Sequence, residues 1–215
     1  MAKSKMNLPN KLTVMRMFMV PVCIAAILIP ENWLNADIGA IIALVIFAAA
    51  SITDAIDGKL ARKYNLITDF GKFMDPLADK FMVIGALLCI FFNSSMSGNK
   101  IMSTVFFFAL VIIFFRELAV TSIRLVASSS GGVVIAANLL GKIKTVTQIV
   151  AISSAMLEPV LWRVVNMIVG KDLIPELVIN YPPITLVSTA ITIYFTIHSG
   201  INYIVGAWKY LDPEK

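Results

Sequence analysis

Six long apolar segments constrain the fold of this sequence more than any other feature. Most approach the ~20 residues that an α-helix needs to cross the ~30 Å hydrocarbon core of a bilayer. Of the 215 residues, 59% are hydrophobic and 14% charged, whereas soluble domains carry roughly 25% charged residues. The sequence therefore predicts an all-α integral membrane protein with six transmembrane helices in a single domain, residues 1–215. The segments lie near residues 12–29, 38–56, 77–92, 101–126, 143–168 and 184–208.

Basic residues are unevenly distributed between the two sides that these helices would define. Cytoplasmic loops and helix ends of membrane proteins carry an excess of Lys and Arg. Here the excess falls on the N-terminal segment, the second and fourth connections and the C-terminal segment, and only Lys100, Arg163 and Lys171 fall on the other side. The pattern predicts a multi-pass protein of the cell membrane with both termini in the cytoplasm.

Four aspartates flank the second connection, on the side predicted to be cytoplasmic. Asp54 and Asp57 are three residues apart and Asp75 and Asp79 are four apart, so each pair would share one helix face. A charged side chain at the centre of a bilayer costs about 2.5–3.5 kcal/mol on insertion scales, so the cluster needs compensation. Carboxylates from two helices are natural ligands of Mg²⁺ or Mn²⁺. Solvated loop charges and an ion pathway are the alternative interpretations, although no internal repeat of the transporter kind is present.

The third helix has an uncertain start, which matters because Asp75 and Asp79 lie there. Pro76 could open this helix in its first turn, since proline lacks a backbone N–H that the first turn does not need. Alternatively, Pro76 lies within a helix that begins near Asp69 and kinks it.

The residues around the aspartates complete a longer pattern. The spacing D-x-x-D-G-x-x-A-R-(x8)-G-x-x-x-D-x-x-x-D is present in full from Asp54 to Asp79. It resembles the signature of the CDP-alcohol phosphotransferases, and the six-helix topology is similar to theirs. The resemblance implies a homodimer that works at the cytoplasmic face. In the implied reaction, an alcohol hydroxyl attacks the β-phosphorus of a CDP-linked donor and CMP leaves.

The resemblance also implies a role for each position of the pattern. Two divalent metal ions, Mg²⁺ or Mn²⁺, would neutralise and orient the diphosphate of the donor. Asp79 would in addition be the general base. The metal ligands would be Asp54, Asp57, Asp75 and Asp79. The residues that shape the CDP pocket would be Gly58, Ala61, Arg62 and Gly71.

A second motif opens the first helix. Asn10, Thr13 and Arg16 recur at every third residue in the segment NLPNKLTVMR. This opening resembles that of the branch of the family that uses glycerol 3-phosphate, and of the related cardiolipin synthases. It implies that Asn10 and Thr13 contribute to donor binding. Judged from the residues alone, Asn10 could instead cap the helix and Arg16 could extend to the membrane interface, and the two interpretations are compatible.

Charged residues also interrupt the fourth and fifth apolar segments. Arg116 lies deep in the fourth segment, Arg124 follows eight residues later, and Lys142 and Lys144 open the fifth. Charges at such depth are functional by default. Arginine and lysine bind phosphate groups, so these four residues are predicted to hold the phosphate of the acceptor. The alternatives are an internal ion pair of Arg116 with Glu117, and ordinary anchoring at the interface by the lysines.

These predictions combine into one reaction, the transfer of a phosphatidyl group from CDP-diacylglycerol to glycerol 3-phosphate. The spacing R-E-x-x-x-T-x-x-R, from Arg116 to Arg124, resembles the same branch of the family. The acyl chains of the donor would reach lipid between helices, which explains the membrane location. The alternatives are another acceptor, such as phosphatidylglycerol, an inositol phosphate or serine, and more remotely a cation transporter.

Overall fold

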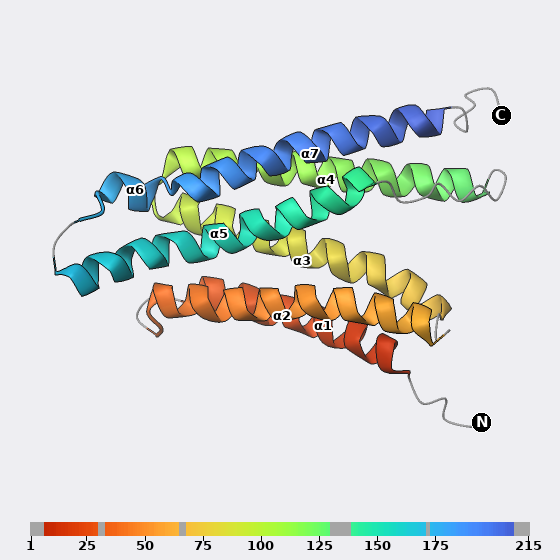
Figure 1. Ribbon diagram of the computed structural model, residues 1–215, viewed down its shortest axis with the longest axis horizontal. Helices are drawn as coiled ribbons and strands as arrows, with labels where there is room; N and C mark the ends of the chain where they lie inside the picture. Colours follow the sequence, from red (N-terminus) through yellow and green to blue (C-terminus); the bar gives the residue numbers. More distant parts are fainter. Residues whose placement is uncertain (1–6, 30–32, 65–67, 130–138, 171–172, 209–215) are drawn as a thin grey trace.

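Long helices account for nearly all of the structure, a computed structural model that describes residues 7–29, 33–64, 68–129, 139–170 and 173–208. Within these ranges, six helices are long and apolar enough to cross a membrane, which confirms the prediction (Figure 1). A further short helix, which the sequence did not predict, precedes the last one. The helices are α1 (Leu8–Leu28), α2 (Ala36–Lys63), α3 (Asp69–Met96), α4 (Lys100–Ser129), α5 (Leu139–Val169), α6 (Glu176–Asn180) and α7 (Pro183–Ala207).

The start of α3 decides between the two predictions for Pro76. The helix begins at Asp69 and contains Pro76 in its interior, so the alternative in which Pro76 opens the helix is wrong. The polar turns before Pro76 lack the apolar character by which the sequence marks a span, yet they continue the helix. As a result, both Asp75 and Asp79 lie on regular helical backbone.

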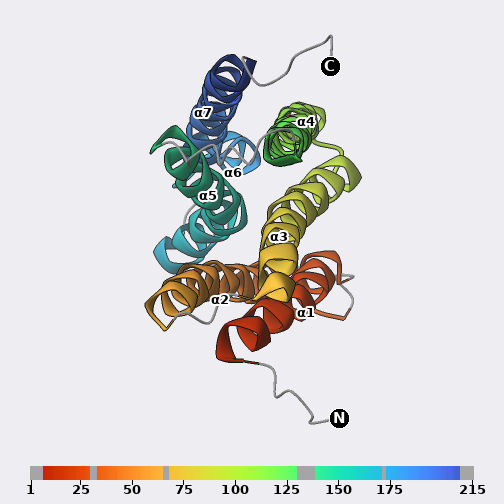
Figure 2. The ribbon, with the colours of Figure 1, turned by 90° about the vertical axis from the view of Figure 1, so that its right-hand side faces the viewer.

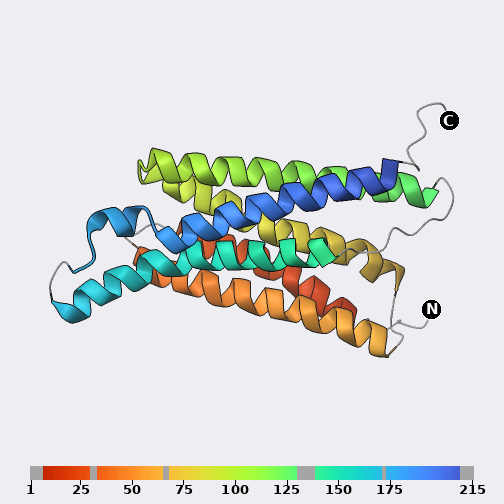
Figure 3. The same ribbon diagram turned by 45° about the horizontal axis from the view of Figure 1, so that its top comes forward.

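The helices form two groups that α3 connects. Helices α1 and α2 pack against each other, α7 packs against both α4 and α5, and α3 contacts α1 as well as α4 (Figure 2). A contact between α2 and α5 also joins the two groups. Figures 1 and 3 both show α3 running obliquely from the end of α2 to the start of α4. The first turns of α3 therefore lie beside the first pair of helices, and its last turns lie beside the second group.

Glycine permits the close packing of α1 on α2. A Cβ added to Gly39 would lie 2.6 Å from the carbonyl oxygen of Ala26, far inside a normal contact. Small residues at helix interfaces let backbones approach in this way in membrane proteins. The outward-facing surface carries large apolar side chains, among them Phe18, Phe115 and Met167, as expected for a bundle surrounded by lipid.

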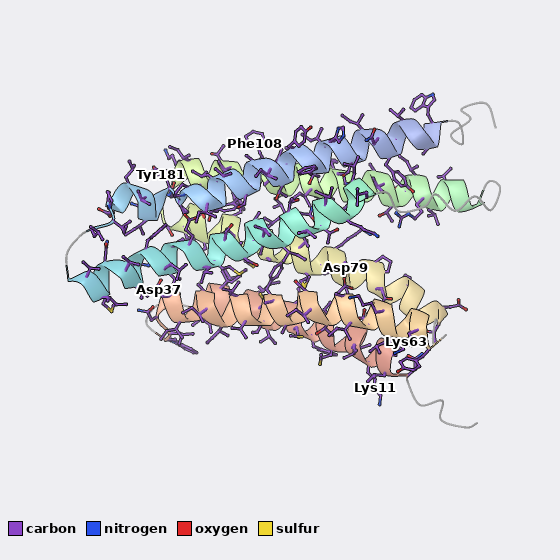
Figure 4. All side chains as sticks on the ribbon, in the orientation of Figure 1. Lys11, Asp37, Lys63, Asp79, Phe108 and Tyr181 are labelled. Carbon is purple, nitrogen blue, oxygen red and sulfur yellow. The ribbon has the colours of Figure 1, made fainter. Side chains whose placement is uncertain are left out.

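The two ends of the bundle differ in chemistry. The start of α1, the end of α2 and the end of α7 lie at one end, which we call the site end (Figure 1). Figure 4 places Lys11 and Lys63 at the site end and Asp37 and Tyr181 at the opposite, far end. Asp79 lies on the half of the bundle nearer to the site end. The predicted catalytic aspartate and the predicted excess of basic residues thus belong to the same end.

Candidate active site

Arg16 on α1 links the aspartates of α2 to those of α3. Its Nη1 lies 2.5 Å from Oδ1 of Asp54 and 2.9 Å from Oδ1 of Asp79, and its Nη2 donates to Oδ2 of Asp57. The side chain of Arg16 has no exposed surface. The alternative in which Arg16 extends to the membrane interface is therefore wrong. A single guanidinium instead compensates charges from both pairs of aspartates.

Thr13 contacts the remaining aspartate. Its hydroxyl donates to Oδ1 of Asp75 at 2.6 Å, and the residue is almost completely buried. Thr13 and Arg16 are three positions apart, so they lie on the same face of α1. That one face of α1 consequently contacts all four aspartates, which the sequence had placed on two other helices.

Asn10 connects α1 to the first turn of α3. Thr68 donates its hydroxyl hydrogen to Oδ1 of Asn10 at 2.9 Å and accepts from the backbone N–H of Gly71 at 3.1 Å. A Cβ at Gly71 would lie 3.1 Å from that same Asn10 oxygen, which is tighter than an ordinary contact, so glycine suits this position. Asn7, not Asn10, caps α1 by accepting from the N–H of Asn10, and the alternative in which Asn10 is the cap is wrong.

A second charged group lies on α4 and α5. Oε1 of Glu117 accepts from Nη1 of Arg116 at 3.1 Å and from Nζ of Lys144. Arg124 lies over the ring of Tyr203 on α7, 5.7 Å from its centre. The internal Arg–Glu ion pair considered from the sequence is thus present. It leaves one more cation than anion in the group formed by Arg116, Glu117 and Lys144, so the group remains attractive to an anion.

A cavity of about 300 Å³ joins the two charged groups. This volume suits a small ligand. Aspartates of α2 and α3 line one wall, and basic residues of α4 and α5 line the other. Three aspartates of the lining, Asp54, Asp75 and Asp79, lie opposite Arg116, Arg124 and Lys144, and the lining also contains Lys80 of α3 and Glu117 of α4.

Not every predicted site residue reaches this cavity. Asp57 is buried against Arg16 and does not line the cavity. Lys142 is exposed and does not line it either. Gly58 follows Asp57 on α2 and is partly buried. Ala61 and Arg62 belong to the end of α2, but their side chains lie outside the described residues. Their assignment to the CDP pocket stays a prediction.

The donor atoms of the site fit a hard divalent cation. Four carboxylates against one guanidinium leave an excess of negative charge, and oxygen donors are what Mg²⁺ and Mn²⁺ prefer. The side chains of Asp54 and Asp79 are 36% and 49% exposed, so they remain accessible. Within the described parts of the chain, no three Asp, Glu, His or Cys side chains converge in a metal-binding arrangement. The metal ligands accordingly stay a prediction.

Two residues gain a more definite place in the site than the sequence gave them. The recurrence of Arg16 after Asn10 and Thr13 was a visible signal, but nothing in it showed that the side chain turns inward. Gln148 follows Lys144 by four residues on α5, lines the cavity and is 2% exposed. Its spacing from Lys144 was the available signal.

The chain also resembles proteins of known name over almost its whole length. A model of the CDP-alcohol phosphatidyltransferase family matches residues 6–205. The CDP-diacylglycerol–glycerol-3-phosphate 3-phosphatidyltransferase of Bacillus subtilis is 35% identical over 97% of this chain and 98% of its own length. A probable phosphatidylglycerophosphate synthase of Mycobacterium tuberculosis is 40% identical over 68% of this chain and 64% of its own. The chain belongs to the CDP-alcohol phosphatidyltransferase family of enzymes.

Proposed function

We propose that this enzyme transfers the phosphatidyl group of CDP-diacylglycerol to glycerol 3-phosphate and so forms phosphatidylglycerophosphate and CMP. The observation that carries the proposal is the cavity, whose lining brings three aspartates of α2 and α3 together with three cations of α4 and α5. The acidic wall suits a metal-bound diphosphate, and the basic wall suits an acceptor with its own phosphate. The Bacillus subtilis relative is named for this reaction.

The basic wall favours glycerol 3-phosphate over the rival acceptors. A phosphate monoester carries close to two negative charges at neutral pH, which Arg116, Arg124 and Lys144 can bind. The single phosphodiester of phosphatidylglycerol carries less charge, and serine carries no phosphate. Lys142 is exposed at the start of α5 and would attract the anion from solution. An inositol phosphate also carries a phosphate monoester, so the basic wall does not distinguish it from glycerol 3-phosphate. A direct comparison of CMP release with the two acceptors does.

The CDP group would bind where α1, α2 and α3 meet. Support comes from the hydrogen bonds that place Asn10 and Thr13 against the first turns of α3. The acyl chains of the donor would extend between helices into the lipid. The residues proposed for this pocket are Asn10, Thr13, Gly58, Ala61, Arg62 and Gly71.

Two divalent cations, Mg²⁺ or Mn²⁺, would be held by Asp54, Asp57, Asp75 and Asp79. Such ions, when bound, neutralise the diphosphate and stabilise the leaving phosphate. The protein's own contribution is to hold four carboxylates on rigid helical backbone and to orient them through α1. Arg16 supplies the positive charge that these carboxylates otherwise lack.

Asp79 is the candidate general base. Its side chain is 49% exposed, against 36% for Asp54 and 4% for Asp57, and it lines the cavity. In the proposed step, the acceptor hydroxyl oxygen bonds to the β-phosphorus, and the hydroxyl proton passes to Asp79. The bond from the β-phosphorus to the bridging oxygen breaks, and CMP leaves with that oxygen.

Release of CMP by the purified protein tests this function. With CDP-diacylglycerol and Mg²⁺, we expect release with glycerol 3-phosphate but not with phosphatidylglycerol, inositol phosphate or serine. The Asp79→Asn variant should keep its fold and lose about 10²–10⁴-fold in kcat, the usual contribution of a general base. Release with phosphatidylglycerol alone would contradict the acceptor, and no release with any acceptor would contradict the donor.

We further propose that the site end faces the cytoplasm and that the enzyme works as a homodimer. The excess of lysine and arginine at the site end supports this orientation. Homodimerisation rests on the family resemblance. Crosslinking of the protein in native membranes would detect the dimer as a species of twice the monomer mass.

A further inference from the structure

The wall of the cavity contains a buried amide without a hydrogen-bond partner. Gln148 is 2% exposed and lines the cavity, and its Nε2 has no acceptor among the described residues. A buried donor without a partner is costly, and folded proteins leave few of them. Because Gln148 lines the cavity, a rotation of its side chain would present this unpaired amide nitrogen to a ligand that brings an acceptor oxygen.

The other neutral donors of the cavity wall are occupied by their own helices. Ser51, Thr121 and Thr145 also line the cavity. Each donates its hydroxyl hydrogen to the carbonyl oxygen of the residue four positions earlier, at 2.8, 2.7 and 3.1 Å respectively. Among the neutral side chains of this wall that the structure describes, the three hydroxyl groups are therefore paired, and the amide N–H donor of Gln148 is not.

The position of Gln148 suits a different group of the acceptor from the one that the cations would bind. It lies one helical turn beyond Lys144 on the same face of α5, about 6 Å farther along the helix axis. The basic residues suit the charged phosphate, whereas a neutral amide suits a neutral oxygen. Glycerol 3-phosphate brings two hydroxyl groups into the cavity. One attacks phosphorus, and the other needs a partner.

We propose that Gln148 donates a hydrogen bond to the non-reacting hydroxyl of the acceptor and makes the enzyme selective for acceptors that carry this second hydroxyl. The inference rests on the proposed function and adds a specificity-determining residue to it. A site built around such a bond discriminates against the analogue without the hydroxyl, because binding that analogue leaves the buried amide unpaired.

The test compares glycerol 3-phosphate with 1,3-propanediol monophosphate, which keeps the phosphate and the primary hydroxyl but lacks the second hydroxyl. The wild-type enzyme should prefer glycerol 3-phosphate by about 10- to 100-fold in kcat/KM. In the Gln148→Met variant, of similar volume, this ratio should fall toward 1 through loss of activity with glycerol 3-phosphate alone. The Gln148→Leu variant removes the same amide and should give the same ratio.

Thr189→Val provides a matched control. Thr189 on α7 is also 2% exposed with an unpartnered hydroxyl, and it borders a small void together with Gln148 but does not line the cavity. This variant should keep the wild-type ratio. The inference is overturned if both Gln148 variants keep the wild-type ratio, if they lose activity equally on both acceptors, or if Thr189→Val lowers the ratio equally. A wild-type enzyme inactive with glycerol 3-phosphate would overturn the proposed function itself.

Discussion

Single residues of the site are held by charge compensation in a buried setting. Arg16 has no exposed surface and contacts three aspartates, one of which, Asp57, is itself only 4% exposed. Buried charges that lose their partner are strongly destabilising, because neither water nor another ion replaces it. The geometry of the aspartates therefore depends on a residue outside the aspartate motif.

Replacement of Arg16 tests this dependence. In metal-free detergent solution, Arg16→Ala should lower the free energy of unfolding by about 3–5 kcal/mol, because it leaves the buried carboxylate of Asp57 uncompensated. Arg163→Ala is the matched control, since Arg163 forms a 2.5 Å ion pair with Asp37 at the far end but is 47% exposed. Partly exposed pairs contribute only about 0–1 kcal/mol.

The Arg16→Ala variant also reports on metal binding, by comparison with the wild type. Added Mg²⁺ should raise the unfolding midpoint of Arg16→Ala more than that of wild type, because the freed carboxylates need a cation. Equal destabilisation by the two substitutions, or no response to Mg²⁺ in either, would contradict this view of the site.

The sequence predicted which aspartates form each pair, but it did not predict that Arg16 would contact both pairs. Spacing along one helix determines which side chains share a face, so Asp54 with Asp57 and Asp75 with Asp79 followed directly. Which residue of α1 would meet that face depends on how the helices pack, and no spacing encodes it. For the same reason Gln148 could be placed on the side of Lys144 but not identified as an unpaired donor.

Helices α1 and α2 must approach closely for Arg16 to reach the aspartates of α2. Gly39 allows that approach, because a Cβ there would lie 2.6 Å from a backbone oxygen of α1. A backbone atom cannot rotate away as the end of a side chain can. The contact lies near the far end, where α2 begins, and it sets how the two helices cross before they reach the site.

Gly39→Ala should therefore destabilise the protein although alanine favours helix formation. We expect a loss of about 1–3 kcal/mol from overpacking, measured by unfolding in detergent. Gly206→Ala in α7 is the matched control, since a Cβ there meets no atom within 4 Å, and it should leave stability unchanged or higher. If both variants unfold alike, close packing at Gly39 is not required.

The beginning and end of each helix could be predicted only where the sequence changes from apolar to polar. All six spans followed from apolar length, but the first turns of α3 were only one of two alternatives, because DFGKFMDP carries charges and a proline. The short helix α6 (Glu176–Asn180) also escaped prediction, since five residues are too few for an apolar periodicity. Of the proposed site residues, Gly71 and Asp75 lie in the first turns of α3, which hydropathy overlooks.

The whole molecule carries its site near one end, and labelling can show which side of the membrane that end faces. Cys23 and Cys89 are buried, so their reaction with a membrane-impermeant maleimide should be slow. In intact cells, the reagent should label a Glu176→Cys variant, at the far end. A Lys63→Cys variant, at the site end, should react only after the membrane is permeabilised. The reverse pattern would contradict the proposed orientation.

At the scale of the molecule, the fold class was predictable, because the thickness of the bilayer sets the length of an apolar span. The side of the membrane that the basic end faces stays a prediction. The division into two helix groups bridged by α3 was not predictable. It depends on small residues such as Gly39 and on side-chain contacts between helices, which an apolar segment does not specify.

The off-centre position of the cavity has a consequence for the traffic of reactants. In the proposed reaction, glycerol 3-phosphate arrives by diffusion in water and CMP departs the same way, both through the site end. The two lipids enter and leave by diffusion within the membrane plane. The enzyme thus takes one reactant from the aqueous solution and the other from the membrane, at the surface where the two meet. No polar molecule needs to travel through the hydrocarbon layer.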